Sequence, residues 1–115
     1  MRMWLVNPEW LCRKHLLGEH VELHMLLGSI EKDKNLTGFI DGGLIDASQL
    51  PSRHMELVEE MERRGYNHNS PIDLTEKAFK YIISAVGKID IHKSIWDLQS
   101  RCSECKNNMG EEIVL

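Results

Sequence analysis

The sequence predicts an all-α fold, a single compact helical domain over residues 1–115 with one long surface loop. Apolar residues recur at helical spacing, helix start and stop signals divide the chain, and no segment alternates with a strand period for long. A chain of 115 residues can build one hydrophobic core without disulfides or a metal. We therefore expect helices joined by loops, and no sheet.

The first helix has a clear start signal. Asn7-Pro8 predicts it, because asparagine caps helices well and proline suits the first turn. The helical pattern then continues to about Lys32. From Asp33 to Leu50 the pattern fades and three glycines appear, which predicts the surface loop, with one helical turn allowed around residues 44–47.

Three further segments follow. Pro51 opens a second helix and Gly65 ends it, whereas Ser70-Pro71 begins a third helical segment that closes at Gly87. A last helix spans roughly Asp90 to Lys106, before an irregular tail. The apolar positions are Met55, Leu57, Val58 and Met61 in the second helix and Leu74, Phe79, Tyr81, Ile82, Ile83 and Val86 in the third segment. We interpret the stripe of Phe79, Ile82, Ile83 and Val86 as core.

The composition is that of an ordinary soluble globular protein, and no apolar run is long enough to span a membrane. Three cysteines are an odd number, which argues against a secreted disulfide framework and favours the cytoplasm (of the host, if the protein is viral). The net charge of −4 argues against indiscriminate affinity for phosphate backbones, although it allows a local basic face.

The run from His15 to Leu23 places one imidazole and two carboxylates on one side of the first helix. At about 100° per residue, Glu19 and Glu22 fall within about 40° of His15. These charges border the apolar stripe, where partial desolvation favours a protonated carboxylate and suits acid/base catalysis. The alternative is a helix boundary at which long charged side chains simply reach solvent.

Three sequence blocks resemble the pyrimidine-dimer DNA glycosylase family, typified by phage endonuclease V. They are HLLGEHVEL at 15–23, PSRHMELVEEMERRGYNHN at 51–69 and SIWDLQSRC at 94–102. The middle block is the most specific, since Arg53, Glu56-Leu57 and Arg64-Gly65-Tyr66-Asn67 fall in register with the family pattern. The blocks occur in the family's order and at similar relative spacing.

The resemblance implies an endonuclease V-like helical domain that binds double-stranded DNA. It would act as a DNA glycosylase with AP-lyase activity on pyrimidine-dimer-like or modified bases, through a Schiff base formed by the N-terminal α-amine. Carried over, the nucleophile is the amine of Met1 and its partner is Glu22. The positions at which the family contacts or orients DNA hold Arg2, His15, His54 and Arg101. We expect no cofactor and no bound metal, and the oligomeric state stays open.

This chemistry is consistent with the residues present. An α-amine has a reference pKa of about 7.7–8.0, against about 10.4 for lysine, so far more of it is the free base at neutral pH. The free amine attacks the sugar C1′, and the iminium formed permits strand elimination. Glu22 would stabilise the oxocarbenium-like charge and later move a proton, while Arg2 would hold a phosphate. The damaged base must first leave the stack, at a cost of about a few kcal/mol.

Three features depart from the family pattern. Met1 is bulky where the type member has a small N-terminal residue, Val21 and Met25 stand where it has arginines, and this chain is acidic. Fewer cations weaken phosphate binding and its salt dependence. The scaffold is therefore also compatible with a different lesion, or with a non-catalytic DNA- or protein-binding module.

Two histidine and cysteine motifs point to metals. The sequence HVELH, from His20 to His24, is similar to a zinc-protease helix, but its glutamate is one position out of that motif. The pair Cys102 and Cys105 is half of a zinc site, whose second half would require Cys12 or a histidine nearby in space. Free thiols are the favoured interpretation.

Aromatic and basic residues leave two more alternatives. Trp4, Trp10 and Trp96 either stack on bases or fill the core. The pair Arg63-Arg64 either complements the dipole at a helix end or contacts a phosphate.

Overall fold

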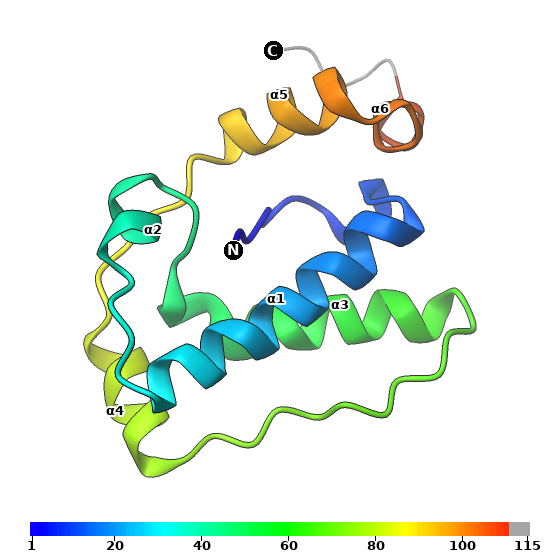
Figure 1. Ribbon diagram of the computed structural model, residues 1–115. Coiled ribbons are helices and arrows are strands. Elements are labelled where there is room, and N and C mark those ends of the chain that lie inside the picture. The colour runs from blue at the N-terminus through cyan, green and yellow to red at the C-terminus, as the bar shows by residue number, and fades with distance from the viewer. Residues whose placement is uncertain (111–115) are drawn as a thin grey trace.

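A computed structural model describes residues 1–110, and every regular element among them is helical, as predicted. Helices α1 and α3 run side by side, α5 and α6 lie across the other side of α1, and the first residues of the chain pass between α1 and α5 (Figure 1). None of the described helices is long and apolar enough to cross a membrane. The elements are η1 (Pro8–Trp10), α1 (Arg13–Glu31), α2 (Thr37–Asp41), η2 (Ala47–Gln49), α3 (Leu50–Arg63), α4 (Glu76–Ser84), α5 (Ile91–Arg101) and α6 (Ser103–Met109).

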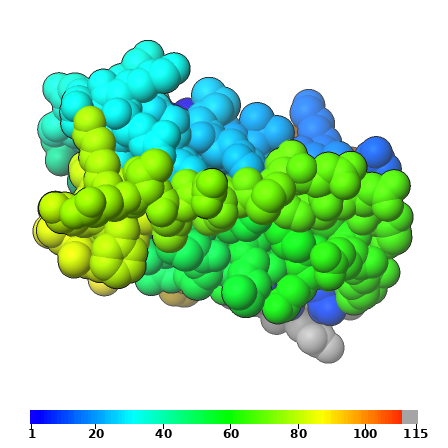
Figure 2. Space-filling model, turned by 90° about the horizontal axis from the view of Figure 1, so that it is seen from below, coloured from blue at the N-terminus to red at the C-terminus, as the bar shows by residue number. Residues whose placement is uncertain are grey.

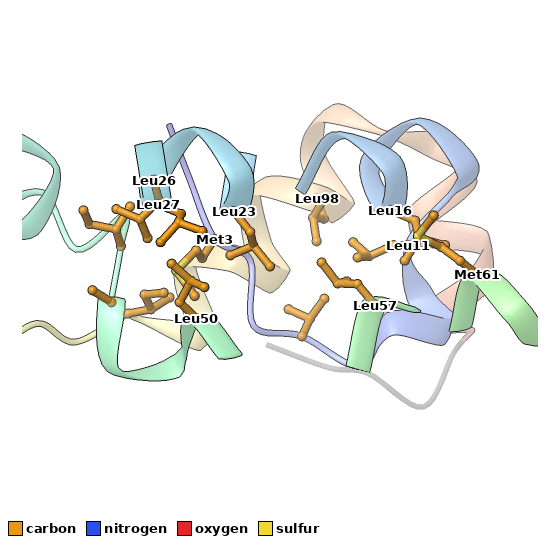
Figure 3. Packing of buried hydrophobic residues seen from close by; sticks show 14 of the residues in the cluster. Met3, Leu11, Leu16, Leu23, Leu26, Leu27, Leu50, Leu57, Met61 and Leu98 are labelled. Atoms are coloured by element: carbon orange, nitrogen blue, oxygen red, sulfur yellow. The ribbon is translucent and has the colours of Figure 1, made fainter. Parts of the chain in front are cut away.

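The core forms where α1 faces α3 and residues 1–7, which we call the N-terminal segment (Figure 3). Leu16 and Leu23 of α1 are two turns apart and fully buried, so they lie on one face of the helix. The opposing side chains come from α3, α5 and the N-terminal segment, and include Leu57, Leu98 and Met3. Burying each such side chain contributes about 1.5–3 kcal/mol. The N-terminal segment is thus part of the core rather than a free end.

The second helix matches its prediction closely. Proline lies in the first turn of α3, and Gly65 ends the helix with a φ of 82°, a conformation that glycine adopts without strain. Of the expected apolar positions, Leu57 and Met61 are buried, whereas Met55 is 63% exposed.

The expected surface loop at 33–50 contains the short helices α2 and η2, and four of its side chains are buried. These buried residues are Leu36, Ile45, Ala47 and Leu50. The backbone N–H of Met3 donates to the carbonyl of Leu44 at 2.8 Å, which ties this connection to the start of the chain.

The long irregular segment lies elsewhere, at residues 64–75. The prediction that Ser70-Pro71 begins a helix is wrong, because α4 begins at Glu76 with Thr75 as its N-cap, whose hydroxyl accepts from the N–H of Ala78. Figure 2 shows the residues after α3 as a ridge along the seam between α1 and α3.

The expected core stripe of the third segment is mostly exposed. Phe79, Ile83 and Val86 are 54%, 67% and 78% exposed, and Ile82 is buried. The Cα trace is 18 Å thick in its shortest dimension, which corresponds to about two layers of packed helices. A helix at the edge of so thin a molecule buries one face only.

Both long predicted helices break at a cysteine. The first was expected from Asn7-Pro8 onward, but η1 ends at Trp10 and α1 restarts after Cys12, its N-cap. The last helix is interrupted at Cys102, whose backbone is extended with φ −136° and ψ 108°, and α6 then runs to Met109. The rest of the predicted irregular tail, residues 111–115, lies outside the described residues.

Candidate functional site

Glu22 receives a hydrogen bond from the first peptide group of the chain. It lies on α1, half-buried beneath the N-terminal segment, and its Oε2 accepts from the backbone N–H of Arg2 at 3.2 Å. One residue spans at most about 3.6 Å, so the α-nitrogen of Met1 lies no more than about 7 Å from that oxygen. The structure thus brings the two expected catalytic groups into one neighbourhood.

Burial raises the pKa of the Glu22 carboxyl above its usual value. The N–H of Arg2, the positive α-amine of Met1 and the Arg2 guanidinium act in the opposite direction. The net effect is a raised pKa, and a raised pKa makes a carboxyl group better suited to general acid or base catalysis.

Arg2 and Arg101 both lie beside Asp97 of α5. The guanidinium of Arg2 is 2.8 Å from Asp97 Oδ2, an ionic contact without the angles of a hydrogen bond, and lies 4.0 Å above the ring of Trp4. Arg101 is 3.7 Å from the other oxygen of Asp97, and its side chain is 70% exposed. Sequence reasoning missed Asp97, because nothing local links it to a residue 95 positions earlier.

Glu19, expected on the same side as Glu22, forms a buried ion pair instead. Arg53 of α3 donates to both of its carboxylate oxygens, at 2.6 and 2.9 Å. Arg53 also donates to the carbonyl of Val6 at 2.7 Å and to Glu56 at 2.8 Å. These bonds fasten the N-terminal segment to α1 and α3, and so help to position the first residues over Glu22.

His15 turns toward the three cysteines. Its Nδ1 is 3.1 Å from Cys12 Sγ and 3.4 Å from Cys105 Sγ, while Cys102 Sγ is 3.8 Å from Cys12 Sγ. The four ligand atoms all lie within 4.8 Å of one another. Burial raises the pKa of the Cys105 thiol to about 12. The first turn of α1 thus brings an imidazole to thiols from the other end of the chain.

His54 belongs to a second cluster, which we call the histidine cluster: His20 of α1, His54 of α3 and His68 of the 64–75 segment. Their Nε2 atoms converge, with His20 3.1 Å from His54 and 3.0 Å from His68. These three nitrogens also satisfy the spacing of metal ligands. The carbonyl of Ser70 is 2.9 Å from His68 Nε2 and 3.3 Å from His54 Nε2. Burial, together with the other histidines, lowers the pKa of His20 to about 4, so this imidazole is neutral.

The zinc-protease interpretation of HVELH fails on geometry. The ring of His24 packs against that of His20 at 4.8 Å, but His24 is absent from both groups of described residues with ligand-like spacing. His20 instead pairs with histidines of other elements, which the i, i+4 pattern did not indicate.

The remaining basic and aromatic candidates have different surroundings in the structure. Arg64 donates to the carbonyls of Pro8 and Leu11, so it stabilises the end of η1, while Arg63 is exposed and pairs with Glu60. Trp96 is 61% exposed and does not fill the core.

Comparison with known proteins identifies the family. A family model described as pyrimidine dimer DNA glycosylase matches residues 1–74, which contain Met1, Arg2 and Glu22. Neither the curated proteins nor the solved structures that were searched gave a match. Because the family model covers more than half of the 115 residues, the chain belongs to the pyrimidine dimer DNA glycosylase family.

Proposed function

We propose that this protein is a DNA glycosylase with AP-lyase activity on pyrimidine dimers or similarly damaged bases in double-stranded DNA. The nucleophile is the α-amine of Met1, and Glu22 is the acid/base partner. One observation carries the proposal: the hydrogen bond from the Arg2 N–H to Glu22 holds the first residue against a half-buried carboxylate, within the stretch that matches the family.

The reaction begins with attack of the free amine on the sugar C1′. The bond from C1′ to the damaged base breaks and the base takes up a proton. The C1′–O4′ bond then opens with protonation of O4′, which converts the amine adduct into an iminium. The ionised Glu22 stabilises the positive charge that develops on the sugar. As a base it then removes a proton from C2′, with the iminium as electron sink, and the C3′–O bond breaks with the 3′ phosphate as the leaving group. Burial raises the pKa of Glu22, which makes its carboxylate a stronger base than an exposed glutamate.

Arg2, Arg101, His15 and His54 have different relations to this site. Arg101 is an exposed cation that pairs with Asp97 beside Arg2, which suits a phosphate contact. Arg2 is paired with Asp97, and this contact positions the first peptide. Arg2 can therefore contact a DNA phosphate only while it also contacts Asp97. We propose that His15 and His54 act indirectly, through the clusters that fix α1 and α3.

The test is borohydride trapping on duplexes that carry a pyrimidine dimer or an abasic site. Wild-type protein should give a covalent adduct through the Met1 nitrogen, located by mass spectrometry of the digested complex. Glu22→Gln should lower the rate of strand cleavage by about 10²–10⁴-fold. The matched control is Glu31→Gln, which changes an exposed glutamate at the far end of α1. Adducts on lysine, or equal rates in both variants, would overturn the assignment.

A non-catalytic binding module is the second candidate, because the two family arginine positions on α1 hold Val21 and Met25, which are 55% and 52% exposed. This candidate predicts no trapped adduct on either substrate. It also predicts an affinity for DNA, or for a protein partner, that Glu22→Gln leaves unchanged.

A further inference from the structure

We propose that Cys12, His15, Cys102 and Cys105 bind one zinc ion as a closed structural site that joins the two ends of the described chain. The site is independent of the proposed enzymatic activity. Its ligands come from α1 and from the junction of α5 and α6, two regions that are 87 or more positions apart in the sequence.

The spacing of the ligand atoms fits a tetrahedral zinc ion. Zn–S bonds of about 2.3 Å and Zn–N bonds of about 2.0–2.1 Å give tetrahedron edges of about 3.8 Å between sulfurs and about 3.6 Å between sulfur and nitrogen. The observed Sγ–Sγ distance between Cys12 and Cys102 is 3.8 Å. The distances from His15 Nδ1 to Cys12 Sγ and Cys105 Sγ are 3.1 and 3.4 Å. Small side-chain movements are enough to close the coordination shell.

The backbone presents the ligands as two equivalent pairs. Cys12 is the N-cap of α1 and His15 lies three residues later; Cys102 is the N-cap of α6 and Cys105 lies three residues later. Each pair therefore spans the first turn of a helix, so that both side chains point to the same side. The two predicted helices break at these caps. Each break costs helical hydrogen bonds, and the need to place a metal ligand explains why the chain breaks there.

The surroundings suit thiolates bound to a cation. The backbone N–H of Cys12 points at Cys105 Sγ at 3.3 Å, and that of Cys105 points at Cys102 Sγ at 3.5 Å. Backbone N–H donors of this kind orient and stabilise metal-bound sulfur ligands. Cys12 and Cys105 are 5% and 0% exposed, which shields a bound ion from water. With four protein ligands no position is left for substrate, so the zinc is structural rather than catalytic.

Two alternatives to this zinc site are less well supported: a disulfide between two of the cysteines, and a metal ion bound by the histidine cluster instead. The described cysteines are all free, and a disulfide would use two of the three and leave the third thiol and His15 unexplained. In the histidine cluster, hydrogen bonds among the rings and with the Ser70 carbonyl already account for the convergence of the nitrogens. Thiols are weak hydrogen-bonding groups, so three of them around one imidazole gain little without a metal.

The decisive test uses the reduced full-length chain, with zinc measured per chain after purification and cobalt(II) as a spectroscopic probe. We expect one zinc per chain and, after exchange, the strong charge-transfer absorption of cobalt thiolate bonds with the visible bands of tetrahedral cobalt. Binding should release the thiol protons to solvent, so metal uptake should weaken as the pH falls. All three cysteines belong to the proposed site, so no other cysteine of the chain can produce the thiolate signal.

Variants separate the two clusters. Cys102→Ser and His15→Ala should lose zinc and weaken the cobalt spectrum, whereas the matched control His68→Gln, in the histidine cluster, should retain both. If a variant fails to fold, the wild-type cobalt titration still decides. A reduced wild-type chain that binds neither zinc nor cobalt through sulfur would overturn the site. So would metal content that follows His68 rather than Cys102.

Discussion

Arg53 is fully buried, and its charge is balanced by Glu19 and Glu56. A guanidinium in such a place is tolerated because its fork donates to two carboxylate oxygens of Glu19 and to the Val6 carbonyl. The pair adds little net stability against an apolar replacement of both partners. Its role is to specify where the N-terminal segment lies, since Val6 is five residues from Met1.

Removing one partner of this pair should be strongly destabilising. Arg53→Met leaves the Glu19 carboxylate buried without its partner, and should lower the free energy of unfolding by about 3–5 kcal/mol in urea denaturation. Adding Glu19→Gln to that variant should recover part of the loss. Arg63→Met, which removes an exposed arginine, is the matched control and should change stability little. An equally small effect for Arg53→Met would show that the buried pair does not form.

At the level of elements, the 64–75 segment is held along α1 and α3 by its contacts to neighbouring helices. His68 reaches His20 and pairs with the Ser70 carbonyl, so the histidine cluster joins three separate parts of the chain. Burial, together with the neighbouring histidines, lowers the pKa of His20, so this cluster favours the neutral form of the His20 ring.

Acid should therefore weaken the fold through His20. An unfolded histidine binds a proton below about pH 6.5, whereas the folded His20 resists protonation down to about pH 4. The free energy of unfolding should thus be highest above pH 6.5 and fall progressively between about pH 6.5 and 4. His20→Gln should make this decline shallower, while the exposed control His92→Gln should not. Denaturant titrations across this range measure it, at equal metal content because acid also weakens metal binding; identical slopes for wild type and His20→Gln would contradict it.

At the level of the whole molecule, α5 and α6 lie outside the stretch that matches the family, yet α5 contacts Arg2, whose backbone N–H binds Glu22. Asp97 of α5 holds Arg2, and Arg101 extends from the same helix into solvent. The position of α5 therefore decides whether the Arg101 side chain lies near the first residues of the chain. In a chain of net charge −4, single cations near the site should matter more than the overall field.

Arg101→Ala should weaken binding to damaged duplex DNA and reduce its salt dependence. Losing one phosphate contact should change the slope of log K against log salt by about 0.9. Lys80→Ala, which removes an exposed cation on α4, is the matched control and should leave that slope unchanged. Binding isotherms at several salt concentrations distinguish them. A slope that Arg101→Ala does not alter would exclude Arg101 from the DNA interface.

The sequence by itself determined the helical class, the start and end of α3, and the placement of Glu22 on the first long helix. These depend on local rules, namely apolar periodicity, a proline in the first turn and a glycine after the last. The blocks at 15–23 and 51–69 also carried the family, which the match over residues 1–74 supports.

Only the tertiary structure decided which side chains meet. Arg2 meets a partner 95 positions away, and Glu19 meets one 34 positions away. His20 meets His54 and His68, which are both at least 34 positions away. No local pattern could select such partners. The exposed face of α4 was unpredictable for a related reason, since an apolar stripe shows which face could be buried, not whether another layer covers it. The same holds for Cys12, His15, Cys102 and Cys105, which the sequence shows as two short spacings and the fold brings within 4.8 Å.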